Sequence, residues 1–460
     1  MSKKIIIIGG GPAGVDAAEA AAKAGAQVTV VSNAPIGGRA GWHSLLPSKV
    51  WLTTADSLAL FSAAGELGMT GLDDLNLTLP AIVERIREVK KSWNTQQKEK
   101  LARLGVQFVP GTARFESVNT IKVIHEEGEE PLVLQADAFI VTTGSAPVFP
   151  PTMKPNGKTI IAPRFASALD TLPDSIAVVG GGATGSEFVY LFNRLGLEVT
   201  WIVDQQSVLP DFDSEAGQFI ADTLTKRGVH LVEGQMASHI DQTNGGIEVV
   251  LADGSRHAAE MAFLAIGRKP DVAALNLEGA GLALENGTVK VDEYGRSTQP
   301  HIYFAGDVTG PPMIANKATA QAWVAGQHAA GQTPTGKLPA ICPPEAIIAA
   351  IYTEPQAAQV GTVSGDNVKT SRVAYSASMK SHLLPEGDGF VKLAYDGNTN
   401  RILGAVAVGP HAADVIAPVA VAIRAGLTMQ EFGVLYGAHP TFSELAFTAA
   451  RQASIRNIHK

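Results

Sequence analysis

Two segments of the chain share one pattern, in which an uninterrupted apolar run is followed by a glycine-rich turn and a helical repeat. The first run covers residues 5–8 and leads into a turn at residues 9–14. The second run covers residues 176–179 and leads into a turn at residues 180–185. Each segment therefore predicts a buried strand, a tight turn and a helix.

The positions after the first turn complete a larger unit. An alanine-rich helical repeat covers residues 15–24, and the apolar run at residues 27–31 predicts a second buried strand, which gives a βαβ unit. A longer helical repeat extends from residue 80 to residue 103, with charged residues on its other faces. Its apolar stripe is expected to contain Ile82, Ile86, Val89 and Trp93.

Two further apolar runs end in turns. Residues 139–145 predict a strand that ends in small residues, and residues 302–307 predict a strand with the carboxylate of Asp307 at its tip. Segments rich in proline lie at residues 147–155 and, together with small residues, at residues 333–344. Such segments indicate domain boundaries.

The C-terminal part of the chain has a different pattern. Short β-rich segments occur up to residue 408, and helical repeats follow at residues 412–424 and 443–456. Strands followed by helices are typical of an α+β domain. The whole chain therefore predicts an α/β protein with two Rossmann-like domains and a C-terminal α+β domain.

Composition and charge narrow the classes of function. The chain has 460 residues, 45% of them hydrophobic, which is enough for several cores. Its net charge of −8 disfavours nucleic acid or an anionic membrane as the main partner. The first apolar run meets a glycine turn too soon for a secretory signal, and no apolar stretch could span a bilayer. Cys342 is the only cysteine, which excludes an internal disulfide and a cysteine metal cluster, so we expect a cytoplasmic protein.

The two glycine turns have the chemistry of a phosphate-binding device. Without side chains, the backbone turns tightly and a pyrophosphate can approach the N-terminus of the following helix, where free N–H groups favour anions. One such turn is weak evidence, but two in the same context predict two bound dinucleotides. The residues concerned are Gly9, Gly11, Pro12, Ala13 and Gly14 in the first turn and Gly180, Gly182 and Gly185 in the second.

Further motifs identify a family. The chain resembles the pyridine nucleotide–disulphide oxidoreductases, the group of dihydrolipoamide dehydrogenase and glutathione reductase, over essentially its full length. Besides the two turns, the resemblance rests on Pro47-Ser48-Lys49, Thr143-Gly144-Ser145, Ala305-Gly306-Asp307, Tyr352-Thr353-Glu354-Pro355 and His439-Pro440-Thr441-Phe442-Ser443-Glu444.

The resemblance implies a domain organisation and an assembly. An FAD-binding domain would comprise residues 1–148 and 266–335, with an NAD(P)-binding domain at residues 149–265 and a dimerisation domain at residues 336–460. The protein would form a homodimer in which each active site takes a histidine from the partner subunit.

The sequence departs from the family at the redox centre. Family members carry a cysteine pair just before the Pro-Ser-Lys motif, and here the two positions hold Ala40 and Leu45. Disulfide exchange needs one thiolate to attack and another to leave. Reduction of a disulfide substrate by the family mechanism is therefore excluded.

The resemblance also implies the residues around the flavin, with Asp307 at its ribityl–pyrophosphate portion. Other residues expected at the cofactors are Gly38, Arg39, Thr143, Gly144, Gly267 and Gly306. An acidic residue usually ends the second strand of such a unit and binds the ribose hydroxyls. Here Ser32 and Asn33 occupy these positions, so FAD is expected with its adenosine end held more weakly or differently.

The second unit carries an indication of nucleotide preference. Asp204 ends its second strand, and Gln205 and Gln206 follow, so that no arginine is present to meet a 2′-phosphate. NAD(H) is therefore favoured over NADP(H). Ala183 stands where relatives often place a bulkier residue that shields the flavin, which indicates either an open nicotinamide pocket or helix packing.

Four residues are candidates for catalysis. By resemblance, Lys49 lies near flavin N5 and pairs with Glu187, where a cation favours the anionic reduced flavin and helps it to accept hydride. The alternative is a surface lysine beside an ordinary helical glutamate. His439 and Glu444 form the acid–base pair of the family. Without sulfur, this pair protonates another acceptor, holds the dimer interface together or is idle.

These observations predict an FAD-dependent NADH oxidoreductase that passes electrons directly to a diffusible acceptor such as a quinone. Trp42, in the altered loop, would stack on a flat acceptor or fill the space left there. The alternatives are a soluble transhydrogenase, a flavin subunit that reduces a protein partner, and a non-catalytic nucleotide-binding flavoprotein. The other histidines lack ligand spacing, and no metal is expected.

Overall fold

The computed structural model describes residues 2–71, 77–125, 130–169, 171–204, 207–332, 344–385 and 387–458. The chain forms two compact units. The first comprises Met1–Ser48, Val83–Val148 and Arg268–Cys342, and the second comprises Lys49–Ile82, Phe149–Gly267 and Pro343–Lys460. Cys342 and all but the last residue of the expected boundary at residues 333–344 lie outside the described residues.

The first unit is built on a five-stranded parallel sheet in the order β18-β7-β1-β2-β3. Its strands are β1 (Lys4–Ile8), β2 (Gln27–Ser32), β3 (Gln107–Pro110), β7 (Ala138–Val141) and β18 (Ile302–Phe304). Ile5 and Ile7 pack into the core formed with the helices on one face of the sheet. Ile6 and Ile8 pack into a second core on the other face. Because both faces of the sheet are covered, this strand is apolar throughout.

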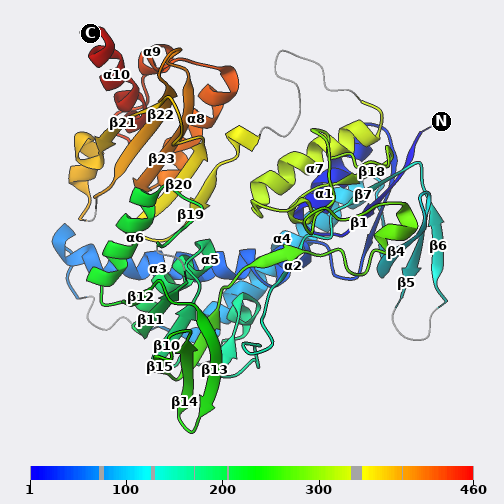
Figure 1. The fold of residues 1–460 in the computed structure, drawn as a ribbon, viewed down its shortest axis with the longest axis horizontal. Coiled ribbons are helices and arrows are strands. Elements are labelled where there is room, and N and C mark those ends of the chain that lie inside the picture. The colour runs from blue at the N-terminus through cyan, green and yellow to red at the C-terminus, as the bar shows by residue number, and fades with distance from the viewer. Residues whose placement is uncertain are drawn as a thin grey trace. The chain divides into compact units, whose positions relative to one another are not determined.

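The helices α1 (Pro12–Lys23) and α7 (Ala315–Ala329) pack side by side on this sheet, as Figure 1 shows. Small side chains permit the close contact, because a Cβ atom at Gly326 would lie 2.5 Å from the carbonyl oxygen of Ala17. The first helix begins at Pro12, three residues before the expected start. Proline fits there because the first turn of a helix leaves its N–H groups without partners.

Smaller elements complete the first unit. An antiparallel sheet of β4 (Thr112–Ser117), β5 (Thr120–Ile124) and β6 (Leu132–Gln135) contributes to the second core, and β8 (Ser145–Pro147) pairs with β17 (Arg268–Pro270). The short helices are α2 (Gly38–Trp42), η3 (Leu277–Ala280) and η4 (Asp307–Thr309). The strand expected at residues 139–145 ends at Val141, and the chain turns at Gly144, which has a φ of +73°.

The long helices are α3 (Leu45–Ala63), followed by η1 (Ala64–Leu67), and α4 (Leu79–Arg103). The stripe expected on α4 is wrong at one position. Ile82 and Ile86 are buried, but Trp93 is 49% exposed, and Asn94 is buried in its place. Helix periodicity does not explain this difference, because Trp93, seven residues after Ile86, lies nearer to the direction of Ile86 than Asn94 does. Asn94 is buried because its side chain packs against Gly37 and Gly41.

The second unit contains a parallel sheet in the order β12-β11-β10-β16-β9. Its strands are β9 (Ile160–Ile161), β10 (Ser175–Val179), β11 (Glu198–Val203), β12 (His230–Glu233) and β16 (Met261–Leu264). The further elements of this part are η2 (Pro163–Ala168), α5 (Ala183–Arg194), α6 (Ser214–Lys226) and the antiparallel strands β13 (Ala237–Thr243), β14 (Gly246–Leu251) and β15 (Arg256–Ala259). As in the first unit, a glycine turn joins the first strand of the pair β10–β11 to its helix.

The C-terminal part of the second unit is an antiparallel sheet in the order β19-β20-β23-β22-β21, covered by helices. The strands are β19 (Ala349–Ile351), β20 (Gln356–Gly361), β21 (Val368–Ala374), β22 (Phe390–Asp396) and β23 (Ile402–Gly409). The helices are α8 (Ala412–Ala425), α9 (Met429–Gly433) and α10 (Glu444–Ile458), with the short η5 (Pro344–Ala346), η6 (Tyr375–Ala377) and η7 (Met379–Leu383). Parallel sheets with a C-terminal antiparallel sheet confirm the predicted fold class.

Candidate functional site

The first glycine turn forms an open cradle at the start of α1. A Cβ atom at Gly9, which has a φ of +113°, would lie 2.5 Å from the Thr142 carbonyl oxygen, and one at Gly14 would lie 1.9 Å from the Gly9 oxygen. A Cβ atom at Gly11 would meet nothing within 4 Å. The turn is therefore closed toward the protein and open in front of the helix N-terminus, which suits an approaching pyrophosphate.

The second turn repeats this arrangement position by position. A Cβ atom at Gly180, which has a φ of +123°, would lie 2.3 Å from the Ala265 oxygen, and one at Gly185 would lie 1.9 Å from the Gly180 oxygen. The space in front of Gly182 is open. Ala183, the first residue of α5, is exposed. The two turns thus present the same backbone device in each of the two compact units.

Two residues near the first turn, Thr143 and Gly144, leave room for a ligand to make polar contacts. Thr143 Oγ1 is buried and has no hydrogen-bond partner among the described residues. A Cβ atom at the neighbouring Gly144 would meet nothing within 4 Å. A buried hydroxyl without a partner is costly, so this position fits a bound polar group such as part of FAD.

At the end of β2, in contrast, the two expected side chains already have hydrogen-bond partners within the protein. Ser32 is buried, and its hydroxyl donates to the Ala34 oxygen at 2.8 Å and accepts from the Ala34 N–H at 3.2 Å. Asn33 is exposed, and its Nδ2 donates to Thr112 Oγ1 at 3.2 Å. Both side chains lie at the expected place, but each is engaged with its own surroundings.

Asp307 belongs to a cluster of charged and polar groups that joins three segments of the first unit. Ser145 Oγ donates to Asp307 Oδ2 at 2.5 Å, and Arg268 donates to the hydroxyl of Ser145 at 2.8 Å and to its carbonyl oxygen at 2.7 Å. Arg39 also donates to this carbonyl oxygen, and its Nη2 lies 2.7 Å from Asp271 Oδ2. Burial lowers the pKa of Arg268, and the Asp307 carboxylate opposes this effect.

Ser145, Arg268 and Asp271 were not expected at the site, although Arg268 directly follows the expected Gly267, and Ser145 lies in a motif of the resemblance. Gly267 has a φ of +112° with open space at its Cβ position. Gly306 packs tightly, because a Cβ atom there would lie 3.1 Å from Ala13 Cβ. Ser145 and Arg268 could have been found in the sequence because each directly follows an expected glycine, Gly144 or Gly267.

The loop that lacks the cysteine pair is folded against the first turn and α4. A Cβ atom at Gly38 would lie 2.7 Å from Gly11 Cα, and the Asn94 side chain occupies the space beside Gly37 and Gly41. Ala40 lies on α2 and Leu45 begins α3. Trp42 is half-buried, and its Nε1 donates to the Ile36 oxygen at 2.9 Å. The structure therefore favours the packing interpretation of Trp42.

Lys49 and Glu187 form an ion pair between α3 and α5. Lys49 Nζ donates to both oxygens of Glu187, at 2.7 and 2.8 Å. The Lys49 side chain is 33% exposed, whereas that of Glu187 is 10% exposed. A third residue takes part, because the Tyr352 N–H donates to Glu187 Oε1 at 3.1 Å and the Tyr352 ring centroid lies 4.7 Å from the ammonium.

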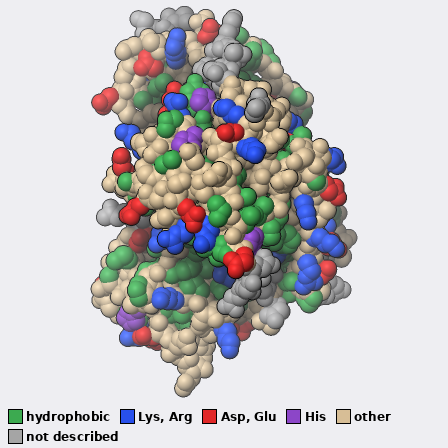
Figure 2. All heavy atoms as spheres, turned by 90° about the vertical axis from the view of Figure 1, so that its right-hand side faces the viewer, with side chains coloured by type: hydrophobic (Ala, Val, Ile, Leu, Met, Phe, Trp, Pro, Cys, Tyr) green, Lys and Arg blue, Asp and Glu red, His purple; other side chains and the backbone are tan. Residues whose placement is uncertain are grey.

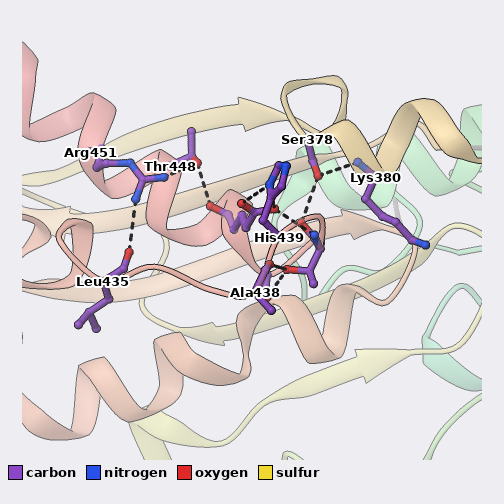
Figure 3. A network of polar contacts seen from close by, with 10 residues as sticks. Ser378, Lys380, Leu435, Ala438, His439, Thr448 and Arg451 are labelled. Carbon is purple, nitrogen blue, oxygen red and sulfur yellow. Dashed lines mark hydrogen bonds and ion pairs between the residues drawn. The ribbon is translucent and has the colours of Figure 1, made fainter.

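Glu444 begins α10, and His439, which Figure 3 shows in a network of polar contacts, lies five residues before it. His439 Nδ1 lies 3.0 Å from Glu444 Oε1, and the Thr441 N–H donates to Glu444 Oε2 at 3.0 Å. Burial acts to raise the pKa of Glu444, but these hydrogen bonds and the neighbouring charges outweigh it and lower the pKa. The carboxylate can therefore orient the imidazole, which is 59% exposed and accessible for proton exchange.

Asp204, the residue expected to indicate the nucleotide preference, is exposed at the carboxyl end of β11. Gln205 and Gln206, which follow it, lie outside the described residues.

The search for other kinds of site covers the described residues. Among them, no group of three or more histidine, aspartate or glutamate side chains could hold a metal ion. None of the described helices is long and apolar enough to cross a membrane. The face in Figure 2 carries acidic and basic side chains interspersed.

Comparison with known proteins places these features in context. The sequence model of the pyridine nucleotide-disulphide oxidoreductases matches residues 3–322, and that of their dimerisation domain matches residues 347–450. The chain is 31% identical to an NAD(P)H dehydrogenase (quinone) of Mycobacterium tuberculosis, covering 98% of this chain and 94% of the relative. It is also 31% identical to dihydrolipoyl dehydrogenase 2 of Haloarcula marismortui, covering 99% and 98%. A crystal structure of LpdA from Mycobacterium tuberculosis matches with a TM-score of 0.90 and 30% identity, covering 98% of this chain and 99% of the other.

Proposed function

Because the chain belongs to the pyridine nucleotide–disulphide oxidoreductase family, we propose that it is an FAD-dependent NADH:quinone oxidoreductase that works without disulfide chemistry. The observation that carries the proposal is that this chain keeps the nucleotide-binding turns and the ion pair but lacks the cysteine pair. Both dinucleotide turns and the Lys49–Glu187 pair are intact, whereas Ala40 and Leu45 stand at the cysteine positions. A relative named NAD(P)H dehydrogenase (quinone) supports the choice of acceptor.

The residues of the chain then have distinct roles. The first turn binds the pyrophosphate of FAD and the second that of the nicotinamide nucleotide, each through free N–H groups at a helix N-terminus. Thr143, Asp307 and the charged groups around Ser145 bind the polar parts of FAD. When bound, FAD accepts a hydride from the nicotinamide and passes two electrons to the acceptor. In this family a lysine at the position of Lys49 faces flavin N5, and Glu187 keeps its ammonium in place here.

Asp204 supports NADH as the donor. The carboxylate is exposed at the end of β11, where such a residue accepts hydrogen bonds from the ribose hydroxyls and repels a 2′-phosphate. The open space at Gly182 admits the pyrophosphate. A transhydrogenase must bind NADP(H) as well as NAD(H). Because Asp204 would repel the 2′-phosphate of NADP(H), the site fits this reaction less well.

His439 and Glu444 are proposed to supply protons to the quinone oxygens. Glu444 is held as a carboxylate and orients the imidazole, while the exposed ring of His439 exchanges protons with the acceptor. The matched dimerisation domain supports a homodimer, in which each pair would serve the site of the partner subunit. A single cysteine in 460 residues supports a cytoplasmic location.

An anaerobic titration of the purified protein, followed by flavin absorbance, tests the proposal. We expect complete bleaching at one NADH per flavin, slow bleaching by NADPH, and reoxidation by a soluble quinone. Lys49→Ala should keep the fold and the flavin but slow the reduction by NADH. A protein that holds no flavin, or whose flavin neither nucleotide reduces, would instead be a non-catalytic nucleotide-binding protein.

A further inference from the structure

Tyr352 contacts both members of the Lys49–Glu187 pair in two different ways. Its backbone N–H donates to Glu187 Oε1 at 3.1 Å, and its ring centroid lies 4.7 Å from Lys49 Nζ. Tyr352 is 39% exposed, so one side of its ring is open to water. One residue therefore fixes the carboxylate through its backbone and faces the ammonium with its aromatic ring.

The backbone at this position is held firmly. Tyr352 directly follows β19, whose last residue Ile351 is fully buried. The next residue, Thr353, is also buried, and its hydroxyl donates to the Pro355 oxygen at 2.7 Å. Arg194 Nη2 lies 2.5 Å from Glu354 Oε2 and anchors the same segment to α5. The ring of Tyr352 thus projects from a fixed point.

The ring limits where the Lys49 ammonium can lie. Two of its hydrogen bonds go to the Glu187 carboxylate, which is itself buried and also accepts the Tyr352 N–H. The lysine is the more exposed partner, with 33% of its side chain accessible, so water competes for it on the open side. An aromatic face within about 6 Å attracts an ammonium and restricts its motion toward water.

We propose that Tyr352 is a positioning residue, which uses its ring face to hold the Lys49 ammonium in the orientation that serves the flavin. This inference rests on the proposed role of Lys49 in the NADH-oxidising site. The phenol oxygen is not required, because the attraction comes from the ring itself.

The test compares Tyr352→Phe, which keeps the ring, with Tyr352→Leu and Tyr352→Met, which remove it. The rate of flavin reduction at saturating NADH and the midpoint potential of the bound flavin are measured for each. We expect the leucine and methionine variants to slow reduction about fivefold. If removal of the ring destabilises the reduced flavin by the same free energy as this fivefold effect, the two-electron midpoint potential of the flavin should fall by about 20 mV. The phenylalanine variant should match the native protein in both measurements.

A second pair of variants separates positioning from a general structural effect. In the background of Lys49→Ala, the change of Tyr352 to leucine should have no further effect on either measurement, because the ammonium is absent. Unaltered rate and potential in both ringless variants would overturn the inference, as would an undiminished effect in the Lys49→Ala background. The midpoint potential is measured with a chemical reductant, so this measurement does not depend on reduction by NADH. Failure of NADH to reduce the native flavin would therefore count against the proposed function and not against the role of Tyr352.

Discussion

Replacement of Gly326 by alanine is predicted to loosen the first compact unit, for which FAD binding is proposed, although alanine is the better helix former. Gly326 lies in α7 against α1, and an added Cβ atom would lie 2.5 Å from the Ala17 oxygen and 2.8 Å from Ala20 Cβ. The obstructing oxygen belongs to the backbone, so the two helices must move apart. Such overpacking costs about 2–3 kcal/mol, and the gain in helix propensity is about 1 kcal/mol.

The net loss of about 1–2 kcal/mol should lower the melting temperature by about 3–6 °C for a unit of this size. FAD affinity should fall as well, because α1 begins at the Gly9–Gly14 turn, and its displacement misaligns the N–H groups of that turn. Melting of the FAD-loaded protein and fluorescence titration of FAD measure the two effects. Gly65→Ala is the matched control, since a Cβ atom at Gly65 meets nothing within 4 Å. An unchanged melting temperature and FAD affinity in Gly326→Ala would refute the packing argument.

Three further predictions address cofactor binding and pH. Thr143→Val should weaken FAD binding about tenfold without destabilising the FAD-free protein, because the lost hydroxyl has no partner within the described chain; a destabilised FAD-free protein would contradict this. Asp204→Arg should raise the ratio of kcat/KM for NADPH to that for NADH at least about tenfold, and an unchanged ratio would place the 2′-position elsewhere. The lowered pKa of Glu444 means that its ionised form contributes stability above its unfolded pKa near 4.5, and that this contribution disappears as the pH falls through the folded value. The difference in melting temperature between the native protein and Glu444→Gln should therefore be present at pH 6–7 and shrink as the pH falls below 4.5; a difference independent of pH would argue against an ionic role.

Much of the fold could be predicted from local patterns. The apolar run at residues 5–8 predicted a strand, and the structure places its alternate isoleucines in two separate cores, so that both faces are covered. The glycine turns follow directly from residue type, since only glycine tolerates the backbone angles and contacts found at Gly9 and Gly180. On α4, in contrast, apolar character and helix periodicity favoured Trp93, whereas the packing of Gly37 and Gly41 against α4 placed Asn94 inside.

The candidate site was predictable in part. The glycine positions, Asp307 and the Lys49–Glu187 pair were expected from motifs, but the groups that surround them were not. Arg268 and Ser145 are 123 residues apart in sequence, and Tyr352 and Glu187 are 165 residues apart. No periodicity relates such positions, because their contact depends on how separate strands and helices pack.

The sequence by itself determined the repeated nucleotide-binding device and the absence of disulfide chemistry. Both are properties of residue type: a glycine sets the freedom of its own backbone, and folding cannot supply the second thiol that the chain lacks. Only the tertiary structure decided the surroundings of the reactive groups, such as the ring of Tyr352 beside the ammonium of Lys49 and the engagement of Ser32 with its own turn. These depend on distances between side chains, which are fixed when the core packs and brings distant segments into contact.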